Sequence, residues 1–142
     1  MTAVDEVLIP IQCEYYALEG VGQLLGNIGM IREHLNHNLH ISGILLTMYD
    51  ARTRLAADVA DEVRGQFGQV VLNNVIPRSV KVSEAPGYGQ TVIDYDPGSR
   101  GALAYFDAAK ELATRGDYQP HPTTGPIGVS PEVYNQLDSE ED

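Results

Sequence analysis

Short apolar runs and stretches with helical spacing alternate along this chain. The apolar runs are 7–11 (VLIPI), 41–49 (ISGILLTMY) and 70–76 (VVLNNVI). Their length and composition predict three strands, the first two of a kind buried on both faces of a sheet. Pro77 is expected to end the third run, because proline fixes φ and lacks an N–H group.

Three longer stretches carry apolar residues three or four positions apart, which predicts amphipathic helices. The first is expected from Glu19 to about Leu35, the second from about Thr53, and the third from about Ser99 to Ala113. Gly68 is placed to end the second helix and Ser99 to cap the third. The predicted core stripes are Val21, Leu24, Leu25, Ile28, Ile31 and Leu35; Leu55, Val59, Val63 and Phe67; and Leu103, Phe106, Ala109 and Leu112.

Strands that alternate with helices predict an α/β fold with a mainly parallel sheet flanked by helices. Three strands would leave an unprotected edge, and the chain begins almost directly on a strand, so we expect an incomplete Rossmann-like domain over residues 1–116. A turn-rich segment, SEAPGYG at 83–89, precedes the last helix. Residues 117–142 hold four prolines and no periodic apolar pattern, and we expect a disordered tail there.

Charge is distributed unevenly along the 142 residues. The formal net charge is −11, yet residues 117–142 carry six acids and no Lys or Arg, which leaves −5 for the rest. Any contact with DNA therefore requires a local basic patch. The single Cys13 excludes an internal disulfide and fits a reducing cytoplasm, and the apolar runs are too short to predict a membrane span. His34, His37 and His40 straddle a helix end, so we expect no metal site.

Three segments carry a family resemblance: VDEVLIPIQCEYYALEG at 4–20, GILLTMYDARTRLA at 43–56 and VIPRSVKVSEAPGYGQTVIDYDPGSRGA at 75–102. Over about residues 4–116 the chain resembles the C-terminal part of the ParA/Soj family of chromosome and plasmid partitioning proteins. The resemblance implies a P-loop NTPase fold with a deviant Walker A loop. It further implies binding of ATP and Mg²⁺, dimerisation around nucleotide, binding of DNA without sequence preference, and hydrolysis stimulated by a ParB-type partner.

The resemblance also implies a cytoplasmic, nucleoid-associated protein. MinD-like relatives share the fold and use a C-terminal membrane helix, but the segment 117–142 is acidic and rich in proline, so we expect no membrane partner.

The sequence departs from the family at the phosphate-binding loop. No segment reads GxxxxGK[ST], and neither Lys81 nor Lys110 follows a glycine-rich loop. Without that loop phosphoryl transfer lacks its phosphate clamp. We therefore expect these residues alone to bind neither ATP nor Mg²⁺ and to lack ATPase activity. A truncated product, a mis-called start and half of a split protein all remain open.

Basic residues just beyond the predicted strands are the candidates for DNA contact. By the resemblance these are Arg52, Arg78 and Lys81, with Arg100 as a weaker fourth candidate. Loops that follow the strands of an open α/β sheet are where its ligands bind. The alternative is that these four residues are ordinary exposed or ion-pairing bases.

The resemblance places Met48, Pro77 and Ser79 on the adenine side of the nucleotide. An apolar Met and a rigid Pro suit the faces of a flat ring. The alternatives are a core role for Met48 and a purely strand-ending role for Pro77.

Gln12 and Glu14 resemble a family segment near the dimer interface or switch region, and a solvated strand end is the alternative. Tyr15 and Tyr16 are expected to pack the helix start rather than to stack bases, and Asp96 fits a turn.

Two functional alternatives stay open, a non-catalytic module that docks on a P-loop partner and a poorly folding remnant.

Overall fold

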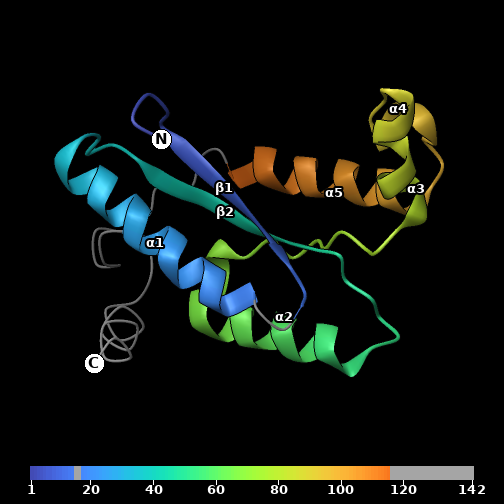
Figure 1. Cartoon of the computed structure of the whole chain (residues 1–142), viewed down its shortest axis with the longest axis horizontal. Coiled ribbons are helices and arrows are strands. Elements are labelled where there is room, and N and C mark those ends of the chain that lie inside the picture. The colour runs from blue at the N-terminus through green and yellow to red at the C-terminus, as the bar shows by residue number, and fades with distance from the viewer. Residues whose placement is uncertain (15–16, 116–142) are drawn as a thin grey trace.

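The structure, a computed structural model, describes residues 1–14 and 17–115, with two parallel strands at its centre. Strand β1 (Glu6–Gln12) pairs with β2 (His40–Thr47), with Ile9 opposite Ile44 and Ile11 opposite Leu46. Helix α1 (Ala17–His34) connects them. Figure 1 shows α1 and α2 (Arg54–Phe67) on one side of the strands and α5 (Arg100–Thr114) on the other. The predicted α/β fold with a parallel sheet flanked by helices is confirmed.

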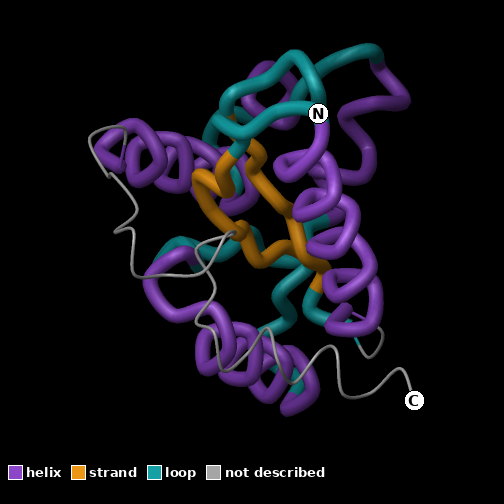
Figure 2. The backbone as a smooth tube through the Cα atoms, turned by 90° about the vertical axis from the view of Figure 1, so that its left-hand side faces the viewer, coloured by secondary structure: helices purple, strands orange, loops and turns teal. Residues whose placement is uncertain are grey.

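The main core lies between the strands and the pair α1 and α2. Ile28 of α1, Ile44 and Leu46 of β2 and Val63 of α2 are completely buried there. Burying a side chain of this size contributes about 1.5–3 kcal/mol. A smaller core on the opposite face joins Leu45 and Leu72 to α5, which contributes Ala104, Tyr105, Ala108 and Leu112. Figure 2 shows the strands enclosed between these helices.

Helix α2 begins and ends where its sequence predicts. The Thr53 hydroxyl accepts a hydrogen bond from Ala56 N at 3.3 Å and so caps the first turn. Gly68 closes the helix with φ of +57°, a backbone angle that favours glycine.

Five residues assigned to core stripes are exposed instead: Leu35, Leu55, Leu103, Phe106 and Ala109. Leu55 lies at the solvated start of α2 and Leu35 lies just beyond α1; their exposed fractions are 47% and 63%. Helix α5 packs on the sheet through Ala108 and on the helical segment 80–95 through Ala102, whereas Leu103 and Phe106 remain 53% and 46% exposed.

The expectation for β1 also needs correction, because only one of its faces is buried. Ile9 and Ile11 face α1 and α2, whereas Leu8 and Pro10 are exposed on the other face. Within residues 1–14 and 17–115, β1 pairs with β2 alone, and α5 covers β2 rather than β1.

The third predicted strand, 70–76, is an irregular segment beside β2. It follows a short 3-10 helix, η1 (Gly68–Val70), and is linked to β2 by Leu72 N donating to Ile44 O and Ile76 N donating to Leu46 O, both at 2.8 Å. Between these bonds, the N–H groups of Asn73 and Asn74 donate to the carboxylate of Glu111 on α5. The Glu111 side chain therefore takes the place of β2 as hydrogen-bond acceptor in the middle of this segment.

A small helical unit joins this segment to α5. It comprises α3 (Val80–Glu84), η2 (Ala85–Tyr88) and α4 (Val92–Tyr95), and Ser99 then caps α5 by accepting from Ala102 N at 3.3 Å. Gly101 packs so closely that a Cβ there would lie 2.6 Å from Val82 Cγ2. None of the helices described is both long and apolar enough to cross a bilayer. The predicted tail, 117–142, and Tyr15 and Tyr16 lie outside the described residues.

Candidate functional site

The loops beyond the carboxyl end of β2 form a hollow of about 820 Å³, which we call the carboxyl-end hollow. Backbone bonds fix two of its walls together: Tyr49 N donates to Ile76 O at 3.0 Å, and Arg78 N donates to Tyr49 O at 2.9 Å. The start of α5 forms the third wall. The lining residues are Tyr49, Asp50, Ala51, Arg52, Val75, Pro77, Arg78, Ser79, Arg100, Leu103, Ala104 and Asp107.

Five of the predicted site residues meet in this hollow. Arg52 comes from the loop after β2, the run Pro77, Arg78 and Ser79 follows the third segment, and Arg100 begins α5. These positions are up to 48 residues apart in the numbering, from Arg52 to Arg100. The fold thus gathers three guanidinium groups from three separate segments at one place.

Arg52 is held by its neighbour Asp50. Its Nε and Nη2 donate to the two carboxylate oxygens at 2.9 and 3.0 Å, while its backbone N–H donates to Oδ1 at 3.1 Å. These hydrogen bonds from Arg52 lower the pKa of Asp50 to about 2. Since the Arg52 side chain is 87% exposed, the guanidinium donors that do not bind Asp50 face solvent.

Arg78 and Arg100 are exposed and differ from Arg52 in their charge balance. In the part of the chain that the structure describes, neither has a carboxylate within ion-pair distance. The charge of Arg78 also contributes to lowering the pKa of Asp50, which places the two groups near each other. Asp107 lines the same hollow, so its three arginines face two carboxylates.

Lys81 and Met48 are not among the lining residues of this hollow. The Lys81 ammonium lies 3.8 Å from Glu84 and 5.7 Å from the centroid of the Tyr95 ring, which itself stacks on Tyr88 at 5.1 Å. The Tyr95 hydroxyl donates to Glu84 at 3.0 Å, and this bond raises the pKa of Tyr95. Met48 is the first residue after β2 and has a φ of +54°, which is unusual for a residue other than glycine.

Gln12 and Glu14 lie at the carboxyl end of β1 and are exposed, with Glu14 N donating to Gln12 O at 2.9 Å. Cys13 between them is buried, and burial raises the pKa of its thiol against the lowering effect of Arg64. The expected interface role of Gln12 and Glu14 therefore stays a prediction on solvated side chains.

Sequence reasoning missed Glu111, which fixes α5 to the third segment, two elements that each contribute residues to this hollow. Its carboxylate accepts from Asn73 N at 2.6 Å, from Asn74 N at 2.9 Å and from Asn74 Nδ2 at 2.8 Å. Burial raises its pKa, but these hydrogen bonds and the charge of Arg115 outweigh burial, so the pKa lies below its ordinary value. No local pattern predicts an interaction across 37 positions, from Asn74 to Glu111.

The chemistry of the lining suits a flat, partly apolar group rather than a metal. Pro77 and Tyr49 offer half-buried apolar surface and Ser79 a hydroxyl. Among the described residues, no group of three His, Cys, Asp or Glu side chains is placed to hold a metal ion. The residues present fit the base end of a nucleotide, and the sequence offers no phosphate loop beside it.

Comparisons with known proteins connect this arrangement to ATPases. A family model described as an AAA domain matches residues 1–41. The sporulation initiation inhibitor protein Soj of Bacillus subtilis is 54% identical over 116 residues, 82% of this chain and 46% of that protein. The chromosome partitioning protein ParA of Caulobacter vibrioides is 49% identical over 115 residues, 81% of this chain and 43% of that protein. The chain thus spans less than half the length of these relatives.

Solved structures give the same likeness in three dimensions. Cobyrinic acid a,c-diamide synthase from Mycobacterium smegmatis, solved with a bound ATP analog and magnesium, matches with a TM-score of 0.60 and 34% identity. That match covers 79% of this chain and 38% of the synthase. The cell division ATPase MinD from Pyrococcus furiosus matches with a TM-score of 0.60 and 25% identity, over 80% of this chain and 44% of MinD.

Proposed function

Because most of this chain is a ParA/Soj-type partitioning ATPase sequence, we propose that it supplies the DNA-facing and adenine-side loops of such an ATPase. In the complete protein the activity would be ATP-dependent dimerisation, binding of DNA without sequence preference, and ATP hydrolysis. These activities would serve segregation of a chromosome or plasmid in the cytoplasm, at the nucleoid. A ParB-type protein would be the partner that stimulates hydrolysis.

The observation that supports this proposal is the gathering of Arg52, Arg78 and Arg100 at the carboxyl-end hollow. Guanidinium groups on exposed loops can neutralise phosphates without reading bases, which gives sequence-independent binding that weakens with salt. The net charge of −11 does not oppose this role, because counterion release depends on the phosphates actually contacted.

On the nucleotide side, Pro77 and Ser79 would hold the adenine, with Met48 in the neighbouring loop that follows β2. The phosphate and Mg²⁺ contacts would come from residues that this sequence does not contain, since it has no GxxxxGK[ST] segment. We propose residues 1–116 as part of the ATPase domain and residues 117–142 as a separate acidic region.

The test assembles this chain with the P-loop-containing half of a ParA/Soj-type protein and measures DNA retention with ATP. Arg52→Glu and Arg78→Glu together should abolish retention. Each single Arg→Gln change should reduce the slope of log affinity against log salt by about 0.9 for every phosphate that the arginine neutralises. Arg32→Glu on α1, outside the hollow, is the matched control and should retain DNA. Full retention by the double variant would remove the DNA assignment.

A second candidate function follows from the missing phosphate loop. The chain could act as a non-catalytic module that docks on a P-loop partner and modulates its dimerisation. Fluorescent ATP added to the 142-residue chain alone should then give no Mg²⁺-dependent signal, and a tight signal would exclude this candidate.

A further inference from the structure

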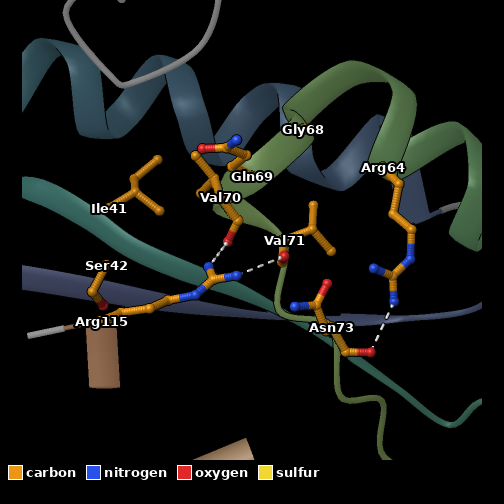
Figure 3. Close-up of a pocket in the computed structure, with 9 residues that line it drawn as sticks. All are labelled: Ile41, Ser42, Arg64, Gly68, Gln69, Val70, Val71, Asn73 and Arg115. Carbon is orange, nitrogen blue, oxygen red and sulfur yellow. Dashed lines mark hydrogen bonds between the residues drawn. The ribbon is translucent and has the colours of Figure 1, made fainter. Parts of the chain in front are cut away.

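A second hollow, of about 530 Å³, lies at the opposite end of β2, and we call it the amino-end hollow. Ile41 and Ser42, at the start of β2, form one wall, and Val70 and Val71 of the third segment form another. Figure 3 shows two arginines in it, Arg64 from α2 and Arg115 from the end of α5. The proposed DNA and nucleotide functions use neither arginine.

Arg115 is largely committed to contacts within the protein. Its Nη1 donates to Val70 O and its Nη2 to Val71 O, each at 3.1 Å, as the dashed lines in Figure 3 show. Nη2 also lies 3.2 Å from the carboxylate of Glu111, which balances its charge. Its Nε and one N–H of Nη1 take no part in these bonds.

Arg64 has a charge that the described residues do not balance. Its Nη2 donates to Asn73 O at 3.2 Å, a neutral acceptor, and no carboxylate of residues 1–14 or 17–115 pairs with it. Among the residues that the structure describes, no acidic side chain lines the hollow. A half-buried guanidinium with four donors to spare, beside a second guanidinium, is a site for an anionic group.

We propose that the amino-end hollow binds a carboxylate group from the acidic segment 117–142 of the same chain. That segment begins two positions after Arg115, which lines the hollow, and holds six acids with no Lys or Arg. Attachment at the rim of a site gives a tethered group an effective concentration in the millimolar range. A carboxylate matches the planar fork of Arg64. The contact would draw the acidic segment to the end of the sheet away from the proposed DNA-facing loops.

Zero-length crosslinking of the full chain tests the contact directly. A carbodiimide joins a carboxylate to an amine that touches it, so Arg64→Lys keeps the charge and makes the position reactive. Arg54→Lys, exposed on the same helix and outside both hollows, is the matched control. Mass spectrometry should find position 64 joined to an acid of 117–142 about tenfold more often than position 54, because the tether is common to both and only position 64 would hold the docked carboxylate.

The crosslink should appear in the monomer and disappear in about 1 M salt, because screening weakens exposed charge pairs. Equal yields at positions 64 and 54, no yield at position 64, or crosslinks confined to dimers would overturn the proposal.

A second measurement leaves both arginines intact. Nuclear magnetic resonance would follow exchange of the Arg64 Nε proton in the native chain and in a full-length chain with a neutral tail. The neutral tail carries Asp117→Asn, Glu132→Gln, Asp138→Asn, Glu140→Gln, Glu141→Gln and Asp142→Asn. Exchange should quicken several-fold in the neutral-tail chain. Unchanged exchange there, together with slowing by added inorganic phosphate in both chains, would identify a site for free anions and refute the proposal.

Discussion

Arginines flank both ends of β2, but the two ends hold them differently. At the carboxyl end, Arg52, Arg78 and Arg100 lie on exposed loops, and only Arg52 has an ion-pair partner among the described residues, its near neighbour Asp50. At the amino end, Arg64 and Arg115 donate to backbone carbonyls of the third segment. The first group can be removed with little structural cost, whereas the second group holds the chain in place. The number of arginines alone therefore does not identify a binding surface.

The strongest way to break this contrast is Glu111→Ala. The Glu111 side chain is only 13% exposed. The change removes the carboxylate that balances Arg115 and leaves the N–H groups of Asn73 and Asn74 without their acceptor. We expect a loss of about 2–4 kcal/mol in the free energy of unfolding, measured by urea denaturation. Glu33→Ala, whose side chain is 75% exposed, should change it by less than about 0.5 kcal/mol.

Acid should erase the same difference. Because the pKa of folded Glu111 lies below its ordinary value of 4.5, the stabilisation is fully present above that pH and is lost as pH falls through the folded value. The difference in the free energy of unfolding between the native chain and Glu111→Ala should thus be constant from neutral pH to about 5 and decrease below it. A gap that persists at the lowest pH would mean that reduced packing, not charge, explains the effect.

Gly101→Ala tests the packing that supports the carboxyl-end hollow. The added Cβ would meet Val82 Cγ2 at 2.6 Å and Ser79 Oγ at 3.3 Å, so α3 must move away from α5. Overpacking of this kind costs about 1–3 kcal/mol, readable as a lower unfolding midpoint. Gly65→Ala in α2 meets nothing within 4 Å, and we expect it to stabilise the chain by up to about 1 kcal/mol.

Arg64→Gln and Arg100→Gln compare one arginine from each end of β2. Loss of the Arg64 bond to Asn73 O should cost about 1 kcal/mol, whereas the exposed Arg100 should give a change within about 0.5 kcal/mol. Thermal unfolding of the two variants side by side measures the difference. Equal losses would contradict the contrast between a structural and a surface arginine.

The smallest effect concerns Asp50, and titration shows it better than stability does. Carbon-detected resonance titration should place its pKa at about 2, and Arg52→Gln should return it towards 3.8 because the hydrogen bonds from Arg52 are the main cause of the shift. Because folding lowers the pKa of Asp50, any stabilisation from its ionised form is present above pH 3.8 and is lost as the pH falls towards 2. An unshifted Asp50 in the native chain would show that Arg52 is not held as described.

Local sequence patterns predicted those helix ends that depend on interactions between residues close in sequence. The start of α2 near Thr53, its end at Gly68 and the cap of α5 at Ser99 all follow from interactions within four positions. The third strand failed because Glu111 competes with β2 for the N–H groups of Asn73 and Asn74, and that partner lies far along the chain. On α5 the stripe was wrong at Leu103 and Phe106, because apolar size was taken as a mark of burial, whereas Leu112 does pack against the core.

The candidate site shows the same division. Position after a predicted strand together with the family resemblance pointed to Arg52 and Arg78, with Arg100 as a weaker candidate. The resemblance alone gave Pro77 and Ser79, and all five line one hollow. Lys81 could not be placed from sequence, since its direction depends on Glu84 and the ring of Tyr95. The pairing of Arg64 with Asn73 O and of Arg115 with Glu111 depends on how helices pack, which periodicity does not encode.

Cys13, the only cysteine of the sequence, gives the protein a built-in chemical reporter. Its thiol is buried at the end of β1, and burial raises its pKa, so little thiolate is present at neutral pH. Alkylating reagents should therefore modify it only when the carboxyl end of β1 separates from β2. The rate of that modification would time local opening of the sheet without any engineered label, and a docked P-loop partner that braces this end should slow it.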